Sequence, residues 1–321
     1  MFHFNEIKTI VWYRIISILR QTKIYPLLYK SYWHSLFFKN NKPNYNNYFS
    51  ATPNKGAGIG HQISNWIAGY WFSKQFNLNF AHTPFPSKDW EFFLGFGSDE
   101  ISVDDLVKNK SFKKILIPLF DEYNKKEKDM IKKIINSYGD SNVVFMCEQD
   151  QFYRDQFGVM DVIKEKFYQA KSREGEHLIY DPKKFNIALH IRRGDILKNL
   201  KSNKNHSMRL QSNEYFFNVL ENTLRMIKTK KKIKIYLFSQ GEKSKFDQFR
   251  YFSNIEFCLD MTAKETFLHL VFSDLLIMSK SSFSYKPGLL NNGLKVCPNN
   301  FWHSYPKTKD WMIVNENFSI I

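Results

Sequence analysis

The chain has 321 residues, of which 43% are hydrophobic and 17% aromatic, so its length suits two domains with a sizeable core and excludes a disordered chain. Lys and Arg outnumber Asp and Glu by 47 to 31, and the formal net charge of +16 favours an anionic partner: nucleic acid, an anionic membrane or a phosphorylated substrate. The widely spaced Cys147, Cys258 and Cys297 form neither a zinc motif nor a disulfide framework, which indicates a reducing compartment.

Residues 1–48 form a basic segment whose apolar residues recur at helical spacing. The segment lacks a membrane-spanning apolar run and is too charged for a signal peptide. Two interpretations remain open. The segment lies as an amphipathic helix on an anionic membrane surface, with Trp12, Tyr13 and Trp33 near the headgroups, or it packs on the first domain with its lysines solvated. We expect a cytoplasmic protein with peripheral contact to the membrane face.

A glycine-rich turn at residues 56–62 precedes an amphipathic helix predicted from about Gln62 to Gln75. Gly58 and Gly60 lack the side chains that would hold a ligand away, and the free amides of a helix N-terminus attract negative charge. A tight strand-to-helix turn is the alternative interpretation. His61 can accept a proton near neutral pH, so we name it as a candidate catalytic base beside the alternative of a structural histidine.

The remainder of the first domain, residues 49–180, alternates strand-like and helix-like segments. Strands are predicted at 78–82, 113–119 and 142–147, with helices at 122–137 and at 149–170, where the chain connects to a second domain. The aromatic segment Trp90–Gly97 has two interpretations. It forms a platform for an acceptor sugar with Glu91 as a second proton acceptor, or it is a hydrophobic loop that fills the domain core, which we favour.

The second domain, residues 181–321, opens with the apolar strand Asn186–Ile191, which ends in Arg192, Arg193, Gly194 and Asp195. The C-terminal tip of a buried strand is where an open α/β sheet binds its ligands, and each arginine can bind phosphate oxygens as a bidentate fork. Gly194 lets the backbone pass close to a ligand, and Asp195 can orient an arginine. A solvated turn with Asp195 as a helix cap is the alternative.

The following segments are predicted as helix 213–228, strand 234–239, strand 254–260, helix 263–272, strand 274–279, helix 285–290 and strand 294–297. This order is typical of a doubly wound, nucleotide-binding α/β domain. Asp260, at a strand tip, is a candidate contact to the nucleoside. Ser281, Ser282 and Ser284 lie at a strand-to-helix turn, where hydroxyls and amides can bind phosphate or cap the helix. The tail from Phe301 is expected to pack across a domain junction.

Three of these segments resemble motifs of the α-1,2- and α-1,6-fucosyltransferase superfamily. His190-Ile191-Arg192-Arg193-Gly194-Asp195 is similar to its His-x-Arg-Arg-x-Asp motif, and Gly56-Ala57-Gly58-Ile59-Gly60-His61-Gln62 resembles its Gly-x-Gly-Asn-Gln loop. Ser281-Ser282-Phe283-Ser284-Tyr285 resembles its Ser-Ser-Phe-Ser-Trp segment. His61 stands where the family carries Asn, so the role of that residue does not transfer.

The resemblance implies an α/β fold of the GT-B type, with two Rossmann-like domains facing a cleft, and inverting transfer of fucose from GDP-fucose to a sugar hydroxyl of a glycan. It implies that residues 49–180 form the acceptor-side domain and that residues 181–321 bind the nucleotide sugar. The implied donor-binding residues are Gly58, Gly60, His190, Arg192, Arg193, Asp260, Ser281, Ser282, Phe283 and Ser284. Arg192 stabilises the leaving diphosphate, and His61, Glu91 and Asp195 are candidate proton acceptors. No cofactor or metal is implied, and the chain contains no Asp-x-Asp motif.

Three rival functions remain open. The donor could be another GDP- or UDP-sugar, or the chain could be a sugar-binding protein without catalytic activity. The charge of +16 is also compatible with a nucleic-acid-binding protein. The lysines are spread along the chain, however, and no nucleic-acid motif is present, so we expect no nucleic-acid partner. The expected partners are a nucleotide-sugar donor and a glycan acceptor, either a cell-surface polysaccharide or a lipid-linked oligosaccharide.

Overall fold

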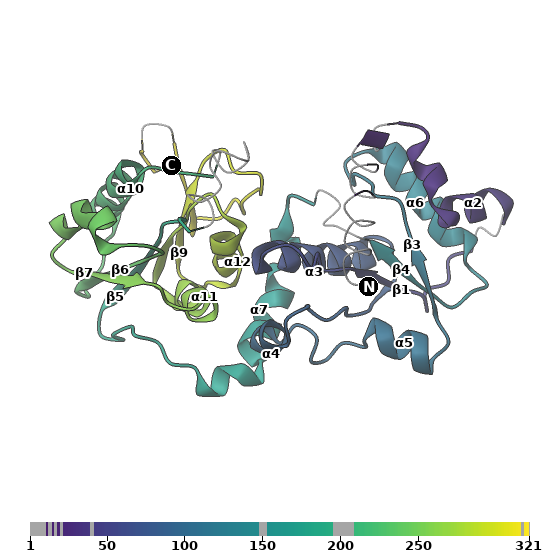
Figure 1. Cartoon of the computed structure of the whole chain (residues 1–321), viewed down its shortest axis with the longest axis horizontal. Helices are drawn as coiled ribbons and strands as arrows, with labels where there is room; N and C mark the ends of the chain where they lie inside the picture. Colours follow the sequence, from purple (N-terminus) through teal and green to yellow (C-terminus); the bar gives the residue numbers. More distant parts are fainter. Residues whose placement is uncertain are drawn as a thin grey trace. The chain divides into compact units, whose positions relative to one another are not determined.

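The computed structural model describes Val11, Ile15, Ile18, Leu19 and residues 22–38, 42–147, 153–194, 209–315 and 318–320. These residues group into two compact units (Figure 1). The first unit consists of the described residues up to Ala57, Gln62–Pro86 and Gly97–Tyr153. The second unit consists of Gly58–His61, Ser87–Phe96 and the described residues from Arg154 onward. The chain therefore contributes two short early segments to the second unit, unlike the contiguous ranges predicted from the sequence.

The first unit contains a four-stranded parallel sheet in the order β2-β1-β4-β3. Its strands are β1 (Tyr48–Ala51), β2 (Asn79–Phe80), β3 (Lys113–Leu116) and β4 (Val143–Cys147). β4 is buried at every residue, as its apolar Val-Val-Phe-Met-Cys sequence predicts. β3 is an edge strand, and its exposed Lys113 and Lys114 are the kind of residues that protect such an edge from pairing.

Several helical segments are associated with this sheet. They are the 3-10 helix η1 (Tyr25–Leu28), α2 (Lys30–Phe37), α3 (Ile59–Gln75), α5 (Val103–Asn109) and α6 (Lys125–Ser137). α5 and α6 begin at polar caps, Ser102 and Asn124. Asn124 caps α6 by accepting from the amides of Lys126 and Glu127. The predicted helix before residue 22 falls largely outside the described residues. In the described part of the chain, no helix is both long enough and apolar enough to cross a bilayer.

The second unit contains a six-stranded parallel sheet in the order β7-β6-β5-β8-β9-β10. Its strands are β5 (Phe185–His190), β6 (Ile233–Ser239), β7 (Ile255–Leu259), β8 (Leu275–Ile277), β9 (Leu294–Pro298) and β10 (Trp311–Val314). Numbered from its own first strand, this order is 3-2-1-4-5-6, which is the Rossmann order and reverses direction between β5 and β8. Two parallel sheets with flanking helices confirm the predicted α/β class.

Helices cover both faces of this second sheet. The described helical segments of this unit are α4 (Lys88–Leu94), η2 (Gln156–Val159), α7 (Met160–Gln169), η3 (Lys171–Gly175), α10 (Asn213–Met226), η4 (Lys243–Tyr251), α11 (Ala263–Phe272) and α12 (Ser282–Leu290), of which α4 and α7 pack on α11. Phe216 of α10 and Phe249 of η4 join the core cluster that contains Ile187 and Leu189 of β5. α11 and α12 lie on the other side of the strands (Figure 1).

Several boundaries differ from the sequence predictions. The strand β1, which ends in Ser50 and Ala51, was not among the predicted strands. The loop expected at 90–97 is a helix from residue 88, capped by the Ser87 hydroxyl and ended by Gly95 in the left-handed conformation. The tail contains β10, which the sequence did not predict, since four residues are too few to establish a period. α3 starts at Ile59, so Gly60 and His61 lie in its first turn.

Candidate functional site

A pocket of about 800 Å³ lies in the second unit at the carboxyl ends of β5, β6 and β7. Five of the predicted site residues line it: His190, Arg192, Arg193, Asp260 and Phe283. Its position beside the β5–β8 reversal is where open α/β sheets bind ligands, and its volume is that of a small-molecule site. Arg192, Arg193 and Lys245 outnumber the one lining carboxylate, Asp260, so the pocket favours an anion.

Arg192 connects the two strands between which the sheet reverses. The chain leaves β5 attached to β6, because the Ile191 amide donates to the Phe238 carbonyl at 3.0 Å and the Ser239 hydroxyl donates to the Ile191 carbonyl at 2.7 Å. The half-buried Arg192 then donates from Nη1 to the hydroxyl of Ser281 at 3.3 Å. Ser281 follows β8 and caps α12 by accepting from the Phe283 amide. One guanidinium thus lies at the reversal point, beside the N-terminus of a helix.

Arg193 is held by protein acceptors. Its Nη1 donates to the Arg192 carbonyl at 2.8 Å, and its Nη2 donates to Oδ1 of Asn213 at 2.5 Å. Asn213, the first residue of α10, donates in turn to the Lys245 carbonyl at 2.6 Å. Burial lowers the pKa of Arg193, but an arginine stays charged under any physiological condition. Arg193 therefore orders the loop and adds positive charge, while Arg192 lies at the α12 cap.

Among the described residues that line the pocket, three have a positive φ: Gly194, Gly241 (φ +110°) and Asp260. Gly194 has φ +60°, and a Cβ there would lie 1.9 Å from Oε1 of Gln240. Asp260 has φ +66°, is exposed, and its amide donates to the Ser239 carbonyl at 3.4 Å. A positive φ is unfavourable for residues that carry a Cβ, so glycine suits the position of Gly194. Asp195, the last residue of the predicted motif, lies outside the described residues.

His190 belongs to a buried polar chain behind the pocket. Its Nδ1 lies 2.9 Å from the hydroxyl of Ser279, which lies 3.3 Å from the hydroxyl of Ser284. Burial, and then the positive charges of Arg192 and Arg193, lower the pKa of His190 to about 3, so the ring is neutral near pH 7. Ser284 is fully buried and donates to backbone carbonyls of its own turn. Its hydroxyl thus serves the turn and does not face the pocket.

The first turns of α3 and α12 are in direct contact. A Cβ added to Gly60 would lie 2.7 Å from the carbonyl carbon and oxygen of Ser282 and 2.9 Å from the amide nitrogen of Phe283. A Cβ added to Gly58 would meet no atom within 4 Å. Because each helix N-terminus carries a partial positive charge, the contact of these two first turns concentrates positive charge near the α12 cap. The sequence predicted each of these turns but not their contact.

His61 lies in the first turn of α3, half-buried, next to a second histidine that the sequence did not single out. Trp302 donates from Nε1 to Nε2 of His303 at 3.1 Å, so Nε2 carries no proton and the Ser282 hydroxyl donates to it at 3.1 Å. Burial, followed by the charges of Lys286, His61 and Arg209, holds the pKa of His303 well below 6.5. His61 is not among the residues that line the pocket.

Glu91 lies on α4, half-buried and also away from the pocket lining. Its neighbours Trp90 and Phe93 pack against Phe267 of α11, with ring centroids 5.7 and 5.8 Å apart. The aromatic segment therefore fills the core of the second unit, although as a helix and not as a loop. Among the described residues, no group of three or more His, Cys, Asp or Glu side chains could hold a metal ion.

Comparison with known proteins gives a likeness of fold. No family model matches the chain, and neither does any curated protein. Similar solved structures include POFUT1 in complex with GDP-fucose, at 11% identity over 78% of this chain and 96% of that chain, TM-score 0.47. A mutant of Arabidopsis thaliana FUT1 in complex with GDP has 9% identity over 90% of this chain and 74% of that chain, with a TM-score of 0.46. The fucosyltransferase NodZ from Bradyrhizobium has 12% identity over 78% of this chain and 94% of that chain, with a TM-score of 0.38.

Proposed function

We propose that the chain is an inverting glycosyltransferase that binds a nucleotide-sugar donor in the pocket of the second unit and transfers fucose from GDP-fucose to a sugar hydroxyl of a glycan. The observation that carries this proposal is the hydrogen bond from Arg192 to Ser281 across the β5–β8 reversal of a Rossmann-ordered sheet. That geometry places a guanidinium and a helix N-terminus where such sheets bind nucleotide phosphates. The resemblance of residues 190–195 to the His-x-Arg-Arg-x-Asp motif supports fucose as the transferred sugar.

The chemistry of the transfer explains why positive charge is needed here. The acceptor oxygen attacks the anomeric carbon from the face opposite the diphosphate, the bond from that carbon to the phosphate oxygen breaks, and GDP leaves with the electron pair. Negative charge therefore builds on the diphosphate, where Arg192 and the α12 N-terminus can stabilise it. Each hydrogen bond to such a charged group contributes about 1.5–3 kcal/mol. These fixed charges would perform the task that a divalent metal performs in other transferases.

The acceptor hydroxyl must lose a proton during the same step. His61 is the first candidate base, because an imidazole accepts protons near neutral pH. Glu91 and Asp195 are the second candidates. The glycan acceptor, as we propose it, belongs to a cell-surface polysaccharide or a lipid-linked oligosaccharide assembled on the cytoplasmic side of a membrane. None of these assignments is required for the diphosphate site itself, so each can be tested alone.

Release of GDP from a panel of nucleotide sugars tests the proposal without knowledge of the acceptor, since water can replace the acceptor in a slow hydrolysis. GDP-fucose should give the highest rate, also in the presence of EDTA, and Arg192→Ala should lower that rate about a hundredfold while the protein stays folded. Arg225→Ala is the matched control, because Arg225 is exposed on α10 and paired with Glu221 at 3.1 Å. An Arg192→Ala variant with the wild-type rate would refute the assignment.

The same panel distinguishes the rival functions. A higher rate with another GDP- or UDP-sugar would keep the fold and the diphosphate site but replace the donor. Salt-sensitive binding to oligonucleotides without any affinity for GDP would favour a nucleic-acid-binding protein. Sugar binding without GDP affinity or turnover would favour a sugar-binding protein that lacks catalysis.

A further inference from the structure

Helix α2 of the first unit has its polar side chains inside and its apolar side chains outside. Ser31 and Ser35 are only 1% and 5% exposed, whereas Trp33 is 43% and Phe37 74% exposed. A surface helix of a globular protein normally buries its apolar stripe, so a reversed pattern marks an interaction surface.

The reversed orientation is fixed by hydrogen bonds on the inner side of the helix. The Ser31 hydroxyl donates to the Leu116 carbonyl of β3 at 2.8 Å. Nδ1 of His34 lies 3.0 Å from the Ser137 hydroxyl, and the His34 ring stacks on Tyr138 of the same region at 3.8 Å. These contacts attach α2 to β3 and to the C-terminal end of α6. The outward position of the apolar side chains is therefore part of the fold.

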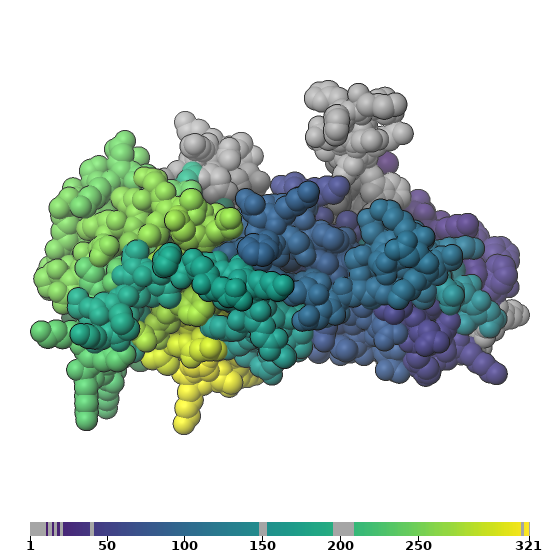
Figure 2. All heavy atoms as spheres, turned by 90° about the horizontal axis from the view of Figure 1, so that it is seen from below, coloured from purple at the N-terminus to yellow at the C-terminus, as the bar shows by residue number. Residues whose placement is uncertain are grey.

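We call the exposed apolar residues of η1, α2 and their flanks the α2 surface: Ile24, Leu27, Leu28, Trp33, Leu36, Phe37 and Phe38. The Trp33 and Phe37 rings stack with centroids 6.4 Å apart, and Nε1 of Trp33 donates to the Leu27 carbonyl at 2.8 Å. The indole therefore has its polar atom satisfied and its apolar face available. In the space-filling view the purple atoms of this N-terminal segment lie at the surface of the first unit (Figure 2).

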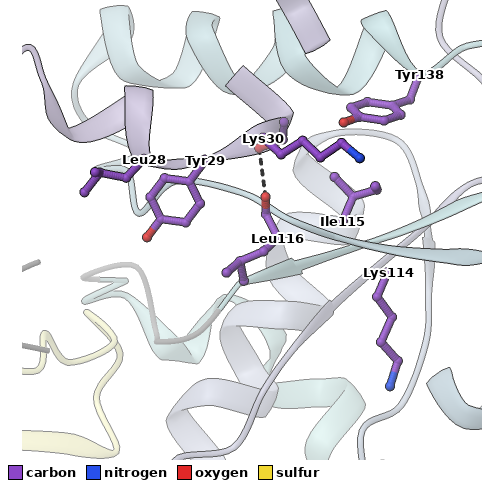
Figure 3. A pocket seen from close by; sticks show the side chains of 8 residues that line it. Leu28, Tyr29, Lys30, Lys114, Ile115, Leu116 and Tyr138 are labelled. Atoms are coloured by element: carbon purple, nitrogen blue, oxygen red, sulfur yellow. Dashed lines mark hydrogen bonds between the residues drawn. The ribbon is translucent and has the colours of Figure 1, made fainter. Parts of the chain in front are cut away.

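A pocket of about 180 Å³ opens beside the α2 surface, between the η1–α2 junction and β3. Figure 3 shows Leu28, Ile115 and Leu116 as its apolar walls and the Lys30 side chain extending toward Tyr138. Burial raises the pKa of Tyr138, which also lines the pocket, to about 12. Apolar walls next to an ammonium group suit an anionic amphiphile.

The part of the sequence that contains the α2 surface carries charge of one sign over a long stretch. Residues 7–88 contain ten Lys or Arg and no Asp or Glu. The neighbouring elements add exposed lysines that outnumber their acidic residues: Lys113 and Lys114 on β3, and Lys125, Lys126, Lys132 and Lys133 on α6. Lys114 is paired with Asp104 at 3.3 Å, and α6 also carries the exposed Asp129. Basic residues around exposed aromatic and aliphatic side chains are what anionic membrane surfaces attract.

We propose that the α2 surface docks on an anionic phospholipid bilayer, with Trp33, Leu36 and Phe37 inserted at the headgroup level and the surrounding lysines over lipid phosphates. A second copy of the chain fits this surface less well, because a two-fold dimer would bring the same lysines against one another. A bilayer supplies both the apolar layer and the opposite charge. This binding does not depend on the transferase activity proposed above.

Vesicle flotation of the full chain tests the proposal. The protein should float with vesicles that contain phosphatidylglycerol and stay unbound with pure phosphatidylcholine. Phe37→Ser should weaken binding about tenfold, from the loss of one buried aromatic side chain. Lys23→Gln and Lys30→Gln should each weaken it about fivefold, and less so at high salt. Phe92→Ser is the matched control, since Phe92 is 64% exposed but belongs to the second unit.

Thermal melting separates docking from structure, because removing an exposed phenylalanine should not lower the melting temperature. Absence of wild-type binding to phosphatidylglycerol vesicles would overturn the proposal. So would full binding by Phe37→Ser and by both lysine variants together. A wild-type dimer in light scattering that Phe37→Ser converts to a monomer would show that a second copy covers the surface, and would also overturn it.

Discussion

Gly60→Ala should separate two helix N-termini that lie in contact at the candidate site. The new methyl group would lie 2.7 Å from the Ser282 carbonyl, whereas ordinary contacts begin at 3.4 Å, so α3 must move away from α12 by about 0.7 Å. The opposing atoms are backbone and cannot rotate aside. Overpacking of this kind costs about 1–3 kcal/mol. Ala regains up to about 1 kcal/mol through its higher helix propensity, so the net loss of stability is about 0–2 kcal/mol.

The displacement should matter more for ligand binding than for folding, because both helix dipoles act on the same diphosphate only while they converge. We expect GDP affinity to fall about tenfold, equivalent to 1.4 kcal/mol, in calorimetric titration. Gly58→Ala provides the control for stability, since a Cβ there meets no protein atom within 4 Å, and it should retain wild-type stability. Equal GDP affinity in wild type and Gly60→Ala would refute a joint role of the two helices.

Three further predictions concern stability. Gly194→Ala, at φ +60°, should cost about 1–2 kcal/mol of backbone strain in denaturant titrations and stay destabilised when Gln240→Ala removes the clash; full recovery would show a purely steric role for Gly194. Because the pKa of His190 is lowered to about 3 in the folded chain, the unfolded chain binds a proton below pH 6.5 that the folded chain does not, and the free energy of unfolding decreases as the pH is lowered. Between pH 7 and pH 5, His190→Asn should therefore lose about 2 kcal/mol less stability than wild type; an equal loss in both proteins would contradict this. Asp310→Asn should cost about 1–3 kcal/mol by leaving the buried Lys295 without its carboxylate at 2.5 Å, a value reduced by the 43% exposure of Asp310, and an unchanged midpoint would refute the pairing.

The second unit was largely predictable because each of its elements carries a local signal. β5, β6 and β7 are apolar runs that end in polar turns, and α11 begins at a capping box of Thr262 and Glu265, so the helix predicted over 263–272 has the observed bounds. Since parallel strands share a carboxyl edge, the strand order places their polar tips together. That reasoning predicted the region in which Arg192 and Ser281 meet.

The contacts that shape the site were not predictable from local pattern. His190 and Ser279 form a hydrogen bond although they are 89 residues apart in the sequence, and Arg193 and Asn213 do so at a separation of 20 residues. No rule of sequence spacing connects either pair. Helical spacing in residues 1–48 indicated an amphipathic helix but did not predict the bounds of α2 or its buried face, because that face is fixed by the contacts of Ser31 with β3 and of His34 with α6. Likewise, no local pattern predicted that α3 begins at Ile59, the start that places Gly60 against the first turn of α12.

The most direct test of the central claim is calorimetric titration of GDP into the wild-type chain and into Arg192→Ala. Arg192 hydrogen-bonds the cap of α12 at the reversal point of the sheet, so wild type should bind GDP, and the variant should bind it at least about tenfold more weakly with an unchanged melting temperature. A wild-type chain without GDP affinity, or a folded Arg192→Ala variant that binds GDP equally well, would contradict the assignment of this pocket as a nucleotide diphosphate site.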